Sequence, residues 1–158
     1  MIDYIIEKPV GFIHLVSAIL ALISGTTVLA LHKGTTLHRK IGYVYAISMI
    51  IVNVTAFMIY RLFGGFGIFH IAAVISLATI VGGMVPILLR KPDSWLSLHL
   101  SCMYWSVMGL YAAFVSEIFT RVPETPFFGM VGIATGVIMF LAAAYFYNAK
   151  PRWEKITI

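Results

Sequence analysis

"PVGFIHLVSAILALISGTTVLALHKGTTLHRK", residues 9–40, decides the fold of this 158-residue chain. Its first part, residues 9–31, contains no Asp, Glu, Lys or Arg, and Lys33, Arg39 and Lys40 follow directly. A helix needs roughly 20 such residues to cross about 30 Å of bilayer hydrocarbon. Basic residues next to a span are typical of its cytoplasmic end. The stretch therefore predicts a membrane helix that leads into a basic inner loop.

The same pattern repeats along the whole chain, which is 61% hydrophobic and 11% charged, with a mean hydropathy of +0.97. Too few charges are present to cover a soluble domain of this size. Long uncharged runs that are continuous rather than alternating favour helices over a membrane β-barrel. The sequence predicts an all-α, polytopic membrane protein with a single domain, residues 1–158. Its five transmembrane helices are expected at about 9–31, 41–62, 67–89, 95–118 and 127–149. We expect four of them to form an antiparallel bundle, with the last as a packing helix.

The basic residues alternate between the two sides of the predicted membrane. One side carries eight: Lys33, Arg39, Lys40, Arg90, Lys91, Lys150, Arg152 and Lys155. The other carries three: Lys8, Arg61 and Arg121. The positive-inside rule then places the N-terminus outside and the C-terminus inside a cell membrane. The net charge of +5 is explained by these loops, which can meet anionic lipid headgroups, and needs no nucleic-acid partner.

Histidines lie near both ends of the predicted spans. His14 and His70 begin the first and third spans and are expected near the outer face, whereas His38 and His99 are expected near the inner face. Ionisable residues within spans are rare and usually functional. In an antiparallel bundle, helices one and three face each other diagonally, as do helices two and four. Each pair can then hold a flat cofactor between two imidazoles, as in haem b ligation.

Two other interpretations stay open. His14 and His70 together with Glu117 supply two imidazoles and a carboxylate, the ligand set of many zinc and non-haem iron sites, with a hydrolytic or metal-handling role. Glu117 can instead pair with Arg121, four residues later on the same helix. The histidines can also serve only packing in a non-catalytic membrane subunit. His99 and Cys102, three residues apart on one helix face, form a possible soft-metal pair.

Three segments together resemble a known family: "KGTTLHRKIGYVY" (33–45), "FGIFH" (66–70) and "LHLSCMYWSVMGLYAAFVSE" (98–117). They are similar to small bacterial predicted membrane proteins of the domain-of-unknown-function family 2306. The matching positions are Lys33, Gly34, Thr35, His38, Arg39, Gly42, His70 and His99, and His14 also agrees. The resemblance implies the membrane fold, over most of the chain up to about residue 120, and implies a bacterial inner membrane.

A looser, topological likeness is to transmembrane di-haem b-type cytochromes, which hold one haem near each face between histidines of alternate helices. His14 with His70, and His38 with His99, resemble that arrangement, although His38 lies at the edge of its span. The leading hypothesis is therefore electron transfer across or along the membrane, with a quinone or a small reductant as redox partner. The glycine face of the last span, Gly129, Gly132 and Gly136, offers a surface for homo-oligomer formation.

Overall fold

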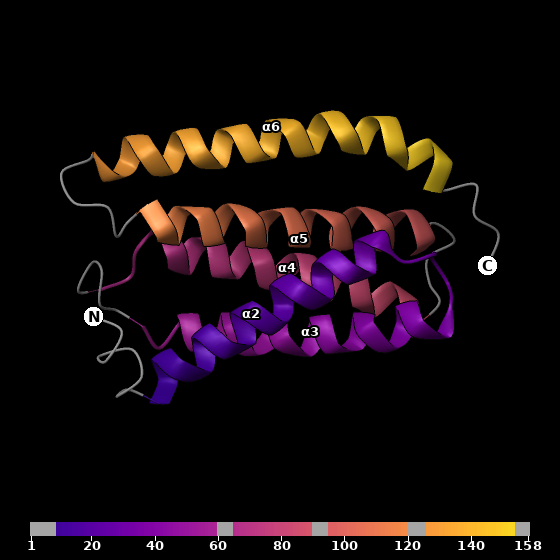
Figure 1. The fold of residues 1–158 in the computed structure, drawn as a ribbon. Helices are drawn as coiled ribbons and strands as arrows, with labels where there is room; N and C mark the ends of the chain where they lie inside the picture. Colours follow the sequence, from indigo (N-terminus) through magenta and orange to yellow (C-terminus); the bar gives the residue numbers. More distant parts are fainter. Residues whose placement is uncertain (1–8, 60–64, 90–94, 120–125, 154–158) are drawn as a thin grey trace. The chain divides into compact units, whose positions relative to one another are not determined.

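The computed structural model describes residues 9–59, 65–89, 95–119 and 126–153, and the regular structure in these ranges is helical. Its five helices are α2 (Pro9–Ala30), α3 (Thr36–Ala56), α4 (Ile68–Leu89), α5 (Trp95–Phe119) and α6 (Phe127–Trp153) (Figure 1). The all-α prediction is confirmed. The chain divides into two compact units, residues 1–81 and 82–158, and the division falls within α4. The predicted single domain with a four-helix bundle stays a prediction.

Four of the five helices, α2, α4, α5 and α6, are long and apolar enough to cross a membrane. The predicted bounds of these four agree with the structure to within four residues. Helix α3 differs, because it begins at Thr36 rather than at 41 and ends at Ala56 rather than near 62. Its charge-free part, residues 41–56, covers only roughly 24 Å at 1.5 Å per residue. A fifth crossing therefore stays a prediction.

Helices α2 and α3 lie side by side as an antiparallel hairpin (Figure 1). Small side chains line the buried stripe of α2: Ser17, Ala21, Ser24, Gly25 and Val28. Small residues let two helix backbones approach closely, which favours packing where lipid offers no hydrophobic driving force. The hydroxyl of Ser17 donates to Ile13 O at 2.7 Å, so this buried polar group is satisfied within its own helix.

Side chains of the loop between α2 and α3 form hydrogen bonds with backbone groups at the ends of both helices. The Lys33 ammonium donates to the carbonyls of Val28 and Leu29, at 3.0 and 2.7 Å, near the C-terminus of α2. Gly34 has a φ of 80°, a left-handed conformation that suits glycine. Thr35 is the N-cap of α3 and accepts from the His38 N–H at 3.1 Å. Burial lowers the pKa of Lys33 below its ordinary value.

In the second unit, α6 packs along α5 (Figure 1). The buried Tyr104 hydroxyl donates to Ala142 O at 2.8 Å, and the hydroxyls of Ser116 and Thr135 are 3.1 Å apart. Aromatic rings surround Tyr104 at centroid distances of 5.1 to 6.3 Å: Trp105, Tyr145, Phe146 and Trp153. These contacts hold α6 against α5, and its place as a packing helix beside a four-helix bundle stays a prediction. Self-association through its glycine face stays a prediction.

Large apolar side chains are exposed on all five helices, for example Ile23 at 61%, Leu88 at 63% and Phe140 at 72%. A soluble monomer rarely exposes apolar surface on this scale. In a bilayer the same side chains face lipid tails, and the buried minority includes polar residues such as Asn53 and His70. Apolar residues outside and polar residues inside are what a lipid-exposed helical protein requires.

Candidate functional site

His14 lies in the second turn of α2 and is hydrogen-bonded to α3. Its Nδ1 is 2.9 Å from Thr55 Oγ1. The single hydroxyl hydrogen of Thr55 is directed to its own helix, with Oγ1 2.7 Å from Ile51 O and 3.0 Å from Val52 O. Oγ1 therefore accepts the hydrogen of His14 Nδ1. The contact fixes the Nδ1–H tautomer of His14, in which Nε2 carries the lone pair.

His99, in the second turn of α5, has the same tautomer for a simpler reason. Its Nδ1 is 3.0 Å from Gly83 O on α4. A carbonyl oxygen only accepts hydrogen bonds, so Nδ1 carries the hydrogen and Nε2 carries the lone pair. Imidazoles that bind metals almost always donate their second ring N–H in this way, often to a backbone carbonyl. His14 and His99 thus share one hydrogen-bonding pattern, with Nδ1 directed at an oxygen atom of a neighbouring helix.

His70, in the first turn of α4, is held differently. The Gly67 N–H donates to His70 Nδ1 at 3.1 Å. The Phe66 ring stacks on the imidazole at a centroid distance of 4.9 Å, and the Phe57 ring lies 6.2 Å away. Only 4% of His70 is exposed. The structure therefore gives His14 and His70 different hydrogen-bonding roles, and their pairing around one cofactor stays a prediction.

His38, which the sequence predicts near the inner face, lies at the basic loop of the first unit, together with His32. His38 occupies the first turn of α3, where its N–H completes the Thr35 cap, and its side chain is partly exposed. His32 is exposed beyond the end of α2. His38 belongs to the first unit and His99 to the second, so the predicted His38–His99 pair stays a prediction.

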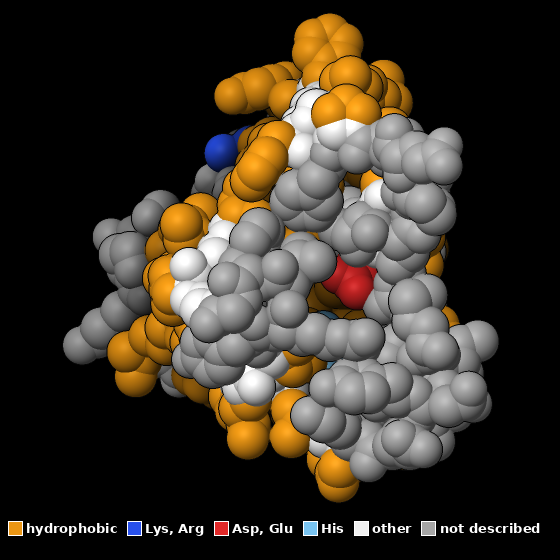
Figure 2. All heavy atoms as spheres, turned by 90° about the vertical axis from the view of Figure 1, so that its left-hand side faces the viewer, with side chains coloured by type: hydrophobic (Ala, Val, Ile, Leu, Met, Phe, Trp, Pro, Cys, Tyr) orange, Lys and Arg blue, Asp and Glu red, His pale blue; other side chains and the backbone are white. Residues whose placement is uncertain are grey.

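Glu117 lies in the last turn of α5 and is exposed. It is the only Asp or Glu among the residues that the structure describes, and Figure 2 shows an acidic side chain in red. Arg121, its alternative partner, lies outside the described residues. In the described part of the chain, no group of three or more His, Cys, Asp or Glu side chains is placed to hold a metal ion. Glu117 belongs to a different unit from His14 and His70, and that ligand set stays a prediction.

Two glycines of α4 allow α5 to approach closely beside His99. A Cβ built on Gly83 would lie 2.8 Å from Met103 Sδ and 3.2 Å from Cys102 Cβ, and one built on Gly82 would lie 3.4 Å from Cys102 Sγ. The bare backbone of Gly83 thus admits both side chains and leaves its carbonyl within reach of His99. Cys102 packs against this backbone, and a shared soft metal with His99 stays a prediction.

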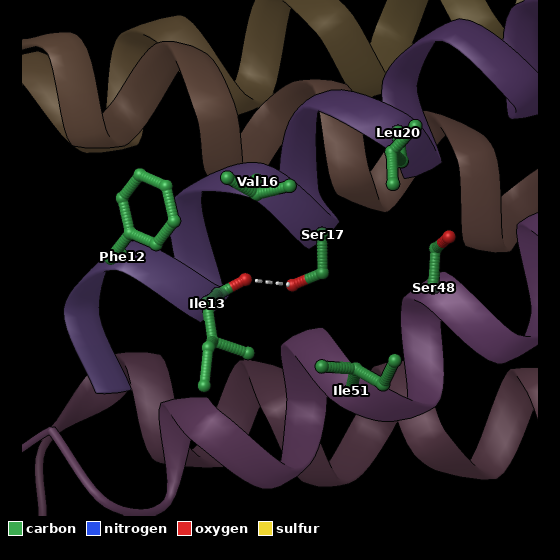
Figure 3. A pocket seen from close by; sticks show the side chains of 7 residues that line it. All are labelled: Phe12, Ile13, Val16, Ser17, Leu20, Ser48 and Ile51. Carbon is green, nitrogen blue, oxygen red and sulfur yellow. Dashed lines mark hydrogen bonds between the residues drawn. The ribbon is translucent and has the colours of Figure 1, made fainter. Parts of the chain in front are cut away.

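A shallow apolar groove of about 210 Å³ lies on the hairpin, between α2 and α3. Its lining is shown in Figure 3: Phe12, Ile13, Val16, Ser17, Leu20, Ser48 and Ile51. The dashed line in Figure 3 is the Ser17–Ile13 hydrogen bond, which occupies one of the two hydroxyls. Five of those seven side chains are apolar, so the groove resembles a surface that contacts lipid chains more than a catalytic cleft.

Sequence reasoning missed the residues that orient the imidazoles. In the sequence, Thr55 is only a polar residue in an apolar helix. Gly83 acts through its backbone carbonyl, and because every residue has one, the sequence does not mark Gly83 as an acceptor. Gly67 was detectable, because a glycine three residues before a polar side chain at a helix start matches the spacing of a capping box. The other two contacts depend on which helix faces cross, and spacing along one helix carries no such information.

Comparisons with curated proteins and with solved structures give no match. The family described as "Predicted membrane protein (DUF2306)" matches residues 11–148. This range includes the basic loop and all four histidines of the predicted ligand pairs, and it covers well over half of the chain. The predicted resemblance is therefore confirmed, and the chain belongs to the DUF2306 family of predicted membrane proteins.

Proposed function

We propose that this integral membrane protein binds haem b and transfers electrons, with His14 and His99 as its best-oriented ligands. One observation carries the proposal: both imidazoles donate Nδ1–H to a neighbouring helix, His14 to Thr55 and His99 to Gly83. In each, Nε2 holds the electron pair that an axial ligand supplies to iron. Ionisable side chains within membrane helices are rare and are usually functional.

The depth of the two histidines supports one site near each membrane face. His14 is the sixth residue of α2 and His99 the fifth of α5, so each lies roughly 6–8 Å along its helix from the start. If successive helices cross in alternating directions, α2 and α5 start from opposite faces. Electrons can then pass between a quinone or small reductant at one face and an acceptor at the other.

The chain's own residues orient the ligands and tune them. Thr55 and Gly83 hold the imidazole planes and raise the basicity of Nε2 through the hydrogen bond to Nδ1–H. Bound haem would supply one-electron chemistry, and its potential would follow from ligand basicity and burial.

An absorption spectrum of the detergent-purified protein, reduced minus oxidised, tests the proposal when metal analysis is done on the same sample. We expect a Soret band and sharp reduced α and β bands, with the haem-to-protein ratio distinguishing one site from two. His14→Ala and His99→Ala should each remove part of the chromophore. His32→Ala is the matched control, because His32 is exposed and lies beyond the end of α2.

Two other outcomes would replace the proposal. A colourless protein with stoichiometric zinc, iron or copper that is lost in both His14→Ala and Glu117→Ala would assign the alternative metal site. A colourless, metal-free protein, purified from cells supplied with haem and metals, would refute cofactor binding. The chain would then be a non-catalytic membrane subunit.

We also propose that the N-terminus faces outward and the basic loop faces the interior of a bacterial cell. Arg39 and Lys40 are exposed on the first turns of α3, where anionic headgroups would meet them. Lys33 is engaged with the α2 carbonyls and contributes less. Fusion of a reporter enzyme to the C-terminus tests the orientation, and Arg39→Gln with Lys40→Gln should weaken it more than Lys33→Gln does.

A further inference from the structure

The first turn of α4 is closed by a reciprocal set of hydrogen bonds between Gly67 and His70. The Gly67 carbonyl accepts from the His70 N–H at 3.0 Å, and the Gly67 N–H donates to His70 Nδ1 at 3.1 Å. Gly67 immediately precedes the first helical residue, Ile68, so it occupies the N-cap and His70 the third helical position. In a capping box, a Glu or Gln side chain at this position accepts the N-cap N–H. Here an imidazole takes that role.

This bond decides the tautomer of His70. A neutral imidazole has one nitrogen with a lone pair and one with a hydrogen. Because Nδ1 accepts from Gly67, Nε2 carries the hydrogen, the reverse of His14 and His99. The ring is also held in place, stacked at 28° on Phe66 and 4% exposed. A ring nitrogen that carries hydrogen has no electron pair for a metal.

We infer that His70 is a positioning residue that caps α4 through Nδ1, and that capping and axial ligation by His70 exclude each other. Ligation through Nε2 would move the ring hydrogen to Nδ1, where it would face the Gly67 N–H donor. The statement about capping stands alone, and the statement about ligation rests on the proposed haem function. Of the predicted outer pair, His14 then supplies a ligand and His70 does not.

Two substitutions separate the two roles. His70→Gln keeps the capping-box acceptor but removes the imidazole, and His70→Ala removes both. We expect His70→Gln to keep the haem-to-protein ratio, the positions of the reduced α and β bands and the unfolding midpoint of the wild type. His70→Ala should lower the midpoint and speed amide exchange in the peptide that contains Gly67. His32→Gln, the same change at an exposed histidine, should alter none of these readings.

A loss of haem, or a shift of the reduced α and β bands, in His70→Gln would overturn the inference by showing that His70 is a ligand. Equal losses of stability and of exchange protection in His70→Gln and His70→Ala would overturn the capping role. If the wild type binds no haem, the proposed function fails. The exchange and unfolding measurements still decide the capping role in that case.

Discussion

Replacing Gly83 by alanine tests whether the close approach of α4 and α5 supports both stability and the orientation of His99. The added Cβ would meet Met103 Sδ at 2.8 Å and Cγ at 3.1 Å, and Cys102 Cβ at 3.2 Å. The Met103 side chain is flexible and can turn aside. The Cys102 Cβ is attached directly to the α5 backbone, so relief of that contact moves the helix.

Three effects determine the size of the change. Overpacking a close contact costs about 1–3 kcal/mol, and weakening the His99–Gly83 hydrogen bond removes about 0.6 kcal/mol in a membrane. Alanine regains up to about 1 kcal/mol of helix propensity. The sum is a net loss of about 0.6–2.6 kcal/mol in the free energy of unfolding. Gly109→Ala on α5 is the matched control, because nothing lies within 4 Å of its added Cβ.

Thermal unfolding of both variants in the same detergent, followed by circular dichroism, gives the comparison. We expect the midpoint of Gly83→Ala to fall and that of Gly109→Ala to stay or rise. If haem is bound, Gly83→Ala should also lose chromophore, because displacement of α5 frees the Nδ1–H of His99 from its acceptor. A Gly83→Ala variant as stable as Gly109→Ala, with an unchanged spectrum, would refute the close-packing argument.

Thr55→Val removes the acceptor of His14 Nδ1–H and should weaken haem retention, measured by dialysis, about 10–100-fold. Thr55→Ser keeps the acceptor and should keep haem retention, so equal retention in the two variants would contradict the tautomer assignment. Burial lowers the pKa of Lys33, so the unfolded state binds more protons between that lowered pKa and the ordinary value of 10.5. The free energy of unfolding should rise with pH in this window and lose that rise in Lys33→Met, as denaturant titrations at several pH values will measure. Tyr104→Phe breaks a buried interhelical hydrogen bond and should cost about 0.6–1 kcal/mol, whereas Tyr147→Phe, 74% exposed, should cost nothing by the same unfolding assay.

The membrane helices were predictable because lipid imposes a simple requirement on sequence. A span must be long and uncharged, and four helices obey this closely. Helix α3 departs from the prediction because a helix can begin before its charge-free part. Arg39 and Lys40 are exposed within its first turns, and the Thr35 cap sets the actual start.

The sequence was enough to predict which histidines are candidate site residues. It was not enough to predict which ring nitrogen of each histidine carries the hydrogen. Helix starts and rise per residue predicted a shallow depth for His14, His70 and His99, and the structure places all three in the first or second turn of their helices. The tautomer of His14 depends on an acceptor, Thr55, that belongs to a neighbouring helix. The tautomer of His70 depends on Gly67, at the start of its own helix. The local cap could have been recognised from spacing, whereas the contact across helices required the fold.

The self-capped loop of the α2–α3 hairpin bears on how the protein is made. Lys33 satisfies carbonyls at the end of α2, and Thr35 satisfies an amide at the start of α3. These three hydrogen bonds join residues of the hairpin itself, within residues 28–38. A nascent chain that has emerged only as far as α3 already contains every group of these three hydrogen bonds, so the turn can form during translation, ahead of the helices that follow.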